Sequence, residues 1–263
     1  MLTHAMVMVA LVSTIAGPGL RRGPLLVGGS DPARGVLVNH NPGVPPFAPP
    51  DPSRPTVVFI HGFNPMPRTV HFTMAERLAD GLNRRGLSNQ VNLLAWDWNA
   101  ATFDSLSVRS NVEDAVGQGH LLAAALIRAG VAPSRTHLIG HSAGGLVATS
   151  AAWDFATLYG QHAAQLTLLE PAAFYHDVIF GRLSAGSLAS RVENYWSPGP
   201  SAFGREVAQA GVQNHRVAGP TPFVGVVCPL RSNHLSLVRW YADSIADPNQ
   251  PAGFNASLLL AGR

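Results

Sequence analysis

Residues 140–144 read Gly-His-Ser-Ala-Gly, a Gly-x-Ser-x-Gly pattern that could hold a reactive serine. A short apolar run, residues 136–139, precedes the pattern, and a segment rich in small residues, 146–152, follows it. This order predicts a strand, a sharp turn and a helix, with the Ser142 hydroxyl at the turn. The two glycines would let the strand and helix backbones approach closely. The pattern therefore predicts Ser142 as a nucleophile; a glycine-rich turn without chemistry is the alternative.

A serine nucleophile needs a histidine that accepts its proton and a carboxylate that orients the histidine. For a serine in such a turn, the three residues follow in the order serine, acid, histidine, near the carboxyl ends of strands. Glu170 ends the apolar run 166–169 and is the best candidate for the acid. Asp97 precedes Ser142, which is the wrong order, and Glu193 lies inside its expected strand rather than at the end.

Eleven histidines could supply the base. Chain order disfavours those before Glu170, and three follow it: His176, His215 and His234. His234 stands directly before an amphipathic segment, residues 235–245, which predicts a terminal helix that could carry the imidazole over the sheet edge. We therefore predict His234 as the base; a histidine at a helix end without a catalytic role is the alternative.

A serine that attacks a carbonyl group produces an oxyanion, which backbone amides can stabilise. One donor is usually the residue after the nucleophile, here Ala143, and the other comes from the loop after an earlier strand. The apolar run 56–60 predicts such a strand, and it ends in His-Gly-Phe. The amides of Phe63 and Ala143 are therefore the predicted oxyanion donors.

The composition, with 46% hydrophobic and 13% charged residues, is that of a globular protein. All 18 basic residues are arginine, which excludes mechanisms that need a lysine. Because the net charge is only +3 and the arginines are scattered, we expect no nucleic-acid partner, although a transient contact with a lipid surface is compatible with this charge. The single cysteine, Cys228, excludes an intramolecular disulfide, and we expect it to be a buried apolar residue. We expect no metal, no cofactor and no obligate protein partner.

The chain divides by composition into three parts. Residues 1–16 contain an apolar run of signal-peptide length, which predicts export, with a cytoplasmic location as the alternative. Residues 17–55 hold ten of the 21 prolines, which predicts an extended lead-in with short edge strands at 25–27 and 35–38. Residues 56–263 alternate between strand and helix patterns, which predicts one α/β domain with a mostly parallel, doubly wound sheet and helices on both faces. The expected strands are 56–60, 91–98, 136–139, 166–169 and 192–196, and the expected helices are 70–85, 111–129, the segment after the serine, and 235–245.

Five segments, in order and at comparable spacing, resemble the pancreatic-lipase family of α/β-hydrolases. They are 59–63, 91–98 with its Trp-Asp-Trp end, 137–142, 168–172, and 232–245, of which the last is the most specific. The resemblance covers about residues 56–254. It implies an α/β-hydrolase fold, with Ser142 as nucleophile, Glu170 as acid and His234 as base. It also implies the Phe63 and Ala143 amides as oxyanion donors.

The chain departs from this family in three respects. Its acid is Glu170 where the family usually has aspartate, residues 197–233 lack the cysteine-bounded lid, and no C-terminal β-sandwich domain is expected. The resemblance therefore implies a single-domain, lid-reduced lipase or esterase of bacterial type, acting on lipid or smaller acyl esters. A phospholipase, a thioesterase or an acyltransferase would use the same triad. A non-catalytic binding protein on a hydrolase fold is the alternative from another class.

Overall fold

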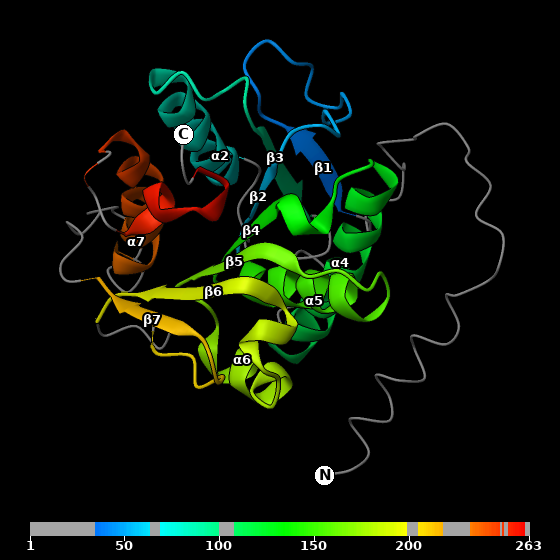
Figure 1. Cartoon of the computed structure of the whole chain (residues 1–263). Helices are drawn as coiled ribbons and strands as arrows, with labels where there is room; N and C mark the ends of the chain where they lie inside the picture. The colour runs from blue at the N-terminus through cyan, green and yellow to red at the C-terminus, as the bar shows by residue number, and fades with distance from the viewer. Residues whose placement is uncertain are drawn as a thin grey trace, which may run out of the picture.

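The computed structural model describes residues 35–63, 69–99, 108–198, 205–217, 232–247, 249 and 252–260. Within these ranges, seven strands form one sheet in the order β1-β3-β2-β4-β5-β6-β7 (Figure 1). Each neighbouring pair is parallel except β1 with β3. The strands are β1 (Val36–Asn39), β2 (Thr56–Ile60), β3 (Asn92–Asp97), β4 (Thr136–His141), β5 (Ala163–Leu169), β6 (Ala189–Trp196) and β7 (Gln213–Arg216).

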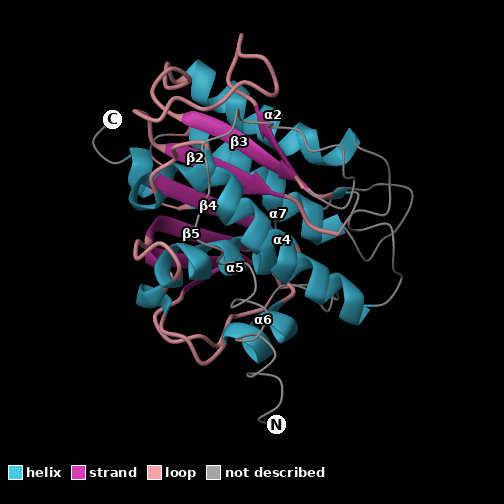
Figure 2. Ribbon diagram, turned by 90° about the vertical axis from the view of Figure 1, so that its right-hand side faces the viewer, coloured by secondary structure: helices cyan, strands magenta, loops and turns pink. Residues whose placement is uncertain are grey.

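Helices cover both faces of the sheet. They are α2 (Thr69–Arg84), α4 (Val108–Arg128), α5 (Gly144–Thr157), α6 (Ala173–Phe180) and α7 (Ser232–Asp243). The helices α4, α5 and α6 pack on one face, and α2 and α7 on the other. Figure 2 shows β3, β2, β4 and β5 side by side in that order. Among the described residues, no helix combines the length and apolar character needed to cross a membrane.

Alternate residues of the central strands serve two separate hydrophobic cores. Val58 and Ile60 of β2 pack towards α4 and α5, whereas Val57 and Phe59 pack towards α2 and α7. All four side chains are buried. A parallel strand that is covered on both faces has no polar face to show, which explains why β2 reads as a continuous apolar run.

A polar layer interrupts the core beside α7. His137 on β4 has its Nε2 2.8 Å from Thr167 Oγ1 and its Nδ1 2.9 Å from Ser257 Oγ. Next to it, Gln165 donates a hydrogen bond of 2.7 Å to the buried Glu193. The Ser257 hydroxyl, and the Leu258 amide that donates to Gln165 Oε1 at 2.8 Å, attach the C-terminal turns, residues 253–260, to the sheet. The turn at 253–256 also packs against α7. Buried polar groups need such partners, because an unpaired one costs about 1–3 kcal/mol.

The α/β-hydrolase fold predicted from the sequence is confirmed, and each strand and helix expected within residues 56–263 occurs within a few residues of its expected bounds. The elements α6 and β7 were not predicted. The edge strand expected at 35–38 occurs as β1, which pairs with β3, so the sheet includes a strand that precedes residue 56. The prolines of this region flank β1 rather than interrupt it, so a short edge strand forms. The other expected edge strand, 25–27, lies outside the described residues.

Candidate active site

Ser142 lies in a sharp turn between the end of β4 and the start of α5. Its φ of 54° is in the left-handed region, which is unusual for a residue other than glycine. The Ser142 amide donates to the Leu169 carbonyl at 3.0 Å, and the Ser142 carbonyl accepts from the Gly145 amide at 3.0 Å. The strained turn is therefore held from both sides, by β5 and by the first turn of the helix.

Gly140 and Gly144 permit this turn because a side chain fits at neither position. A Cβ at residue 140 would lie 2.4 Å from the Gly144 carbonyl oxygen, and one at residue 144 would lie 2.4 Å from the His61 carbonyl oxygen. The predicted close approach of the backbones is confirmed. Gly62 is equally restricted, since a Cβ there would lie 2.7 Å from Ser142 Cβ. The loop after β2 therefore borders the Ser142 side chain.

Glu170 directly follows β5 and is completely buried. Its φ is 46°, so Ser142 and Glu170 are the two non-glycine residues with positive φ in the described part of the chain. One carboxylate oxygen, Oε1, accepts the Ser197 amide at 2.6 Å. The other, Oε2, has no hydrogen-bond partner among the described residues and lies 3.8 Å from His234 Nδ1. A buried carboxylate in this arrangement can orient an imidazole and stabilise its protonated form.

His234 is the third residue of α7, and 13% of its side chain is exposed. Its ring centroid lies 4.4 Å from that of His141, the residue before Ser142. The His234 carbonyl oxygen lies 3.2 Å from His141 Nε2. The structure therefore brings His234 against both Glu170 and the turn that carries Ser142, although these residues are far apart in the sequence.

The two predicted oxyanion donors belong to segments that border Ser142. Ala143 is the N-cap of α5 and has helical backbone angles, φ −59° and ψ −27°. The amides at the start of a helix have no partner within the helix and point towards the positive end of its dipole, which favours a bound anion. Phe63 follows Gly62 in the loop beside Ser142. Both amides therefore lie in segments that border Ser142, where they could donate hydrogen bonds to an oxyanion.

His61 also lies near the site, but its ring nitrogens hold the loop after β2. Its Nδ1 lies 2.7 Å from the Gly62 carbonyl, and because a carbonyl only accepts, Nδ1 must carry the hydrogen. Its Nε2 then accepts the Trp98 amide at 3.1 Å. Asp97 lies 3.7 Å from His61 Nε2 and accepts the Asn99 amide. These bonds attach the end of β2 to the end of β3.

Sequence reasoning missed two residues of this site, Ser197 and His141. Ser197 contributes its backbone amide, and a backbone contact does not depend on the residue type. Its position just after β6 was the only sign in the sequence that it could belong to the site. Chain order disfavours His141 as the base because it precedes Glu170. Chain order gives no information on which residues contact the base, so it could not identify His141 as a neighbour of His234. Cys228 and most of the region expected to lack a lid lie outside the described residues.

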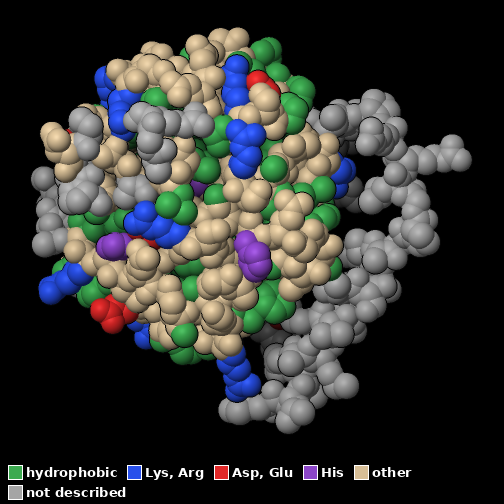
Figure 3. Space-filling view, viewed as in Figure 1, with side chains coloured by type: hydrophobic (Ala, Val, Ile, Leu, Met, Phe, Trp, Pro, Cys, Tyr) green, Lys and Arg blue, Asp and Glu red, His purple; other side chains and the backbone are tan. Residues whose placement is uncertain are grey.

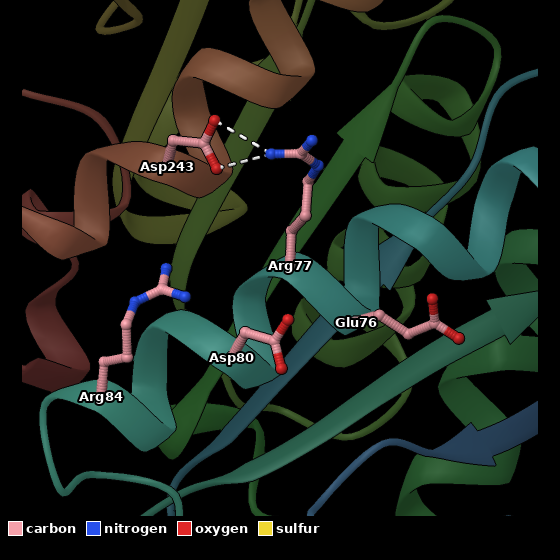
Figure 4. A pocket seen from close by; sticks show the side chains of 5 residues that line it. All are labelled: Glu76, Arg77, Asp80, Arg84 and Asp243. Atoms are coloured by element: carbon pink, nitrogen blue, oxygen red, sulfur yellow. Dashed lines mark hydrogen bonds and ion pairs between the residues drawn. The ribbon is translucent and has the colours of Figure 1, made fainter.

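A charged pocket lies between α2 and α7, and none of the predicted catalytic residues lines it (Figure 4). Arg77 of α2 donates to both carboxylate oxygens of Asp243 on α7, at 2.9 and 3.1 Å. Both side chains are more than one third exposed, so this ion pair contributes little to stability. On the face shown in Figure 3, arginines are scattered among acidic and uncharged groups. Among the described residues, no three metal-binding side chains form a cluster.

No protein-family model and no curated protein matches the chain in sequence. It is similar in structure to a hyperthermophilic esterase from the archaeon Pyrobaculum calidifontis, with 18% identity, 82% of this chain and 86% of that chain covered, and a TM-score of 0.45. It is also similar to the butyrate-bound esterase Est2 of the planctomycete Thermogutta terrifontis, with 12% identity, coverage of 69% and 77%, and a TM-score of 0.40. The α/β hydrolase MGS-M1, from a Medee basin deep-sea metagenome library, has 15% identity, coverage of 74% and 86%, and a TM-score of 0.40. Likenesses this distant carry no argument about activity, so the resemblance to the pancreatic-lipase family stays a prediction.

Proposed function

We propose that this protein is a serine hydrolase that cleaves carboxylic esters through an acyl-enzyme intermediate. One observation carries the proposal: a serine in a strained turn and a fully buried glutamate directly follow two neighbouring parallel strands, and α7 brings a histidine against the glutamate and against the residue before the serine. Left-handed backbone at a residue other than glycine costs about 1–2 kcal/mol. That strain, together with a buried carboxylate oxygen facing an imidazole, favours a catalytic site over a simple connection between strand and helix.

In the first half of the reaction, Ser142 Oγ attacks the ester carbonyl carbon, and His234 Nε2 accepts the hydroxyl proton. Glu170 Oε2 faces His234 Nδ1. The carboxylate therefore favours a hydrogen on Nδ1, which leaves the lone pair on Nε2 for the serine proton. The negative charge of Glu170 then stabilises the imidazolium that forms.

The Phe63 and Ala143 amides donate to the oxyanion of the tetrahedral intermediate, and loss of one such donor costs about 10²–10³ in rate. When the intermediate collapses, His234 returns its proton to the leaving alcohol, and the acyl group stays on Ser142. In the second half, a water molecule gives a proton to His234 and attacks the acyl carbonyl carbon. The carboxylic acid is released, and His234 returns the proton to Ser142 Oγ.

We infer further that the substrate is a lipid or a smaller acyl ester, as for a lid-reduced lipase or esterase. A phospholipase, a thioesterase or an acyltransferase would form the same acyl-enzyme and differ in the leaving group or the acceptor. The length of the preferred acyl chain distinguishes a lipase from an esterase, since an esterase favours short chains and a lipase favours long ones.

Hydrolysis of p-nitrophenyl esters from acetate to palmitate tests this function. We expect wild type to show a maximum at one chain length, Ser142→Ala to lose nearly all activity, and Glu170→Ala to fall by roughly 10⁴-fold. Ser150→Ala is the matched control, because it removes a buried hydroxyl of α5 that donates to the Val116 carbonyl at 2.9 Å. Inactivity of the wild type at every chain length, or full activity of Ser142→Ala, would contradict the proposal.

A further inference from the structure

His141, the residue before the nucleophile, contacts two other parts of the site. Its Nε2 lies 3.2 Å from the His234 carbonyl oxygen. A carbonyl can only accept, so Nε2 carries a hydrogen and donates it. The two imidazole rings lie 4.4 Å apart between centroids and are tilted by 44°. The Nδ1 edge faces Gly62, because a Cβ on that glycine would lie 3.3 Å from His141 Nδ1.

The contact with Glu170 is too long to hold His234 by itself. Oε2 of Glu170 and Nδ1 of His234 are 3.8 Å apart, which is within ion-pair distance but beyond a hydrogen bond. A general base must nevertheless stay within hydrogen-bond reach of the proton it takes. A displacement of about 1 Å can lower the rate by roughly 10²-fold. His141 adds two contacts to His234, one to its backbone and one to its ring.

We propose that His141 is a positioning residue that holds the backbone and ring of His234 against the Ser142 turn. This inference rests on the proposed function, since it takes His234 as the base. His141 transfers no proton in the reaction, because its Nε2 hydrogen is directed to a carbonyl. Because His141 directly precedes Ser142 in the chain, the residue that positions the base is bonded covalently to the nucleophile.

Substitutions at His141 can distinguish a side chain that only fills space from one that donates a hydrogen bond. Glutamine carries its Nε2 the same number of bonds from Cα as histidine does, so His141→Gln keeps a donor at this reach. His141→Asn places its amide nitrogen one bond closer, and His141→Phe keeps the ring without a donor. The buried site, in which His141 is 6% exposed, accepts side chains of similar size best.

The experiment compares these variants on the best p-nitrophenyl ester of the series. We expect His141→Phe and His141→Asn to lower kcat by roughly 10- to 100-fold with KM within about twofold of wild type. His141→Gln should stay within about threefold of wild type in kcat, since it restores the donor. The rate at which a fluorophosphonate labels Ser142 should fall in the same order, because labelling also needs the base. His120→Gln is the control, since it changes a histidine on α4 that pairs with Asp154 away from the site.

Thermal melting separates positioning from folding. If His141→Phe does not fold, the smaller His141→Leu takes its place as a donor-free variant. The inference is overturned if a folded donor-free variant keeps the wild-type kcat, or if His141→Gln fails as badly as His141→Phe at an unchanged melting temperature. A wild-type protein that is inert to both esters and fluorophosphonate would instead overturn the proposed function, and this inference with it.

Discussion

Acid should destabilise this protein steeply, because two buried histidines resist protonation in the folded state. His137 lies between Thr167 and Ser257, and its burial, with the charge of Arg191 adding, lowers its pKa from 6.5 to about 3. His176 lies beside Thr149, and burial lowers its pKa from 6.5 to about 4. In the unfolded chain both imidazoles are solvated, so their pKa returns to the ordinary value.

The direction follows from proton binding. Between pH 6.5 and about pH 4, the unfolded chain binds protons at both positions and the folded chain does not, so stability falls as the pH falls through this window. With about 1.4 kcal/mol per pKa unit, a change from pH 7 to pH 4 costs about 3 kcal/mol for each histidine. The sum, about 6 kcal/mol, is comparable with the total stability of about 5–15 kcal/mol of a typical domain.

Urea unfolding followed by tryptophan fluorescence at pH 4, 5, 6 and 7 would measure this effect. Replacement by glutamine removes the titrating group, so His137→Gln and His176→Gln should each lower the slope of unfolding free energy against pH by about 1.4 kcal/mol per pH unit near pH 5. The slope is the informative quantity, because either substitution also changes the stability at pH 7. Equal slopes for wild type and His137→Gln would refute the reasoning, since His137 would then titrate alike in both states.

Three further predictions concern the backbone and the acid. Ser142→Gly should be more stable than Ser142→Ala by about 1 kcal/mol in urea unfolding, because glycine adopts a φ of 54° without strain; equal stabilities would argue against strain at this turn. Gly144→Ala should destabilise the fold by about 2 kcal/mol or more, because its Cβ would lie 2.4 Å from the His61 carbonyl oxygen; a stable, active Gly144→Ala would show that the turn can widen. Glu170→Asp should lower kcat about 10-fold or more, because the shorter side chain moves the carboxylate away from a histidine that is already 3.8 Å distant; unchanged steady-state kinetics would mean that the backbone adapts.

The success of sequence reasoning on the fold depended on how completely each element is buried. The strand β2 was predictable because both of its faces pack against helices, which favours a continuous apolar run. The edge strand β7 reads Gln-Asn-His-Arg and is mostly exposed, so its apolar content gives no signal; its pairing with β6 makes it a strand. The helix α6 has only eight residues and exposes Phe174 and Val178, which hides the helical alternation of polar and apolar positions.

In the candidate site, too, some residues could be predicted from the sequence and others could not. Ser142 and its glycines were predictable because the turn imposes a local pattern on the sequence. The bond from His141 to His234 joins residues 93 positions apart, and it depends on where α7 packs on the sheet. The Ser197 amide that binds Glu170 comes from the backbone of a third strand end. Such contacts are set by tertiary packing, and no local pattern records them.

Covalent labelling of the nucleophile tests the central claim most directly. Wild-type protein would be treated with a fluorophosphonate and the label located by peptide mass spectrometry, while ester hydrolysis is measured on the same samples. We predict one phosphonyl group, on Ser142, and a loss of activity in proportion to the labelled fraction. A label on another residue, or ester hydrolysis that continues when Ser142 is fully labelled, would contradict the assignment of Ser142 as the nucleophile.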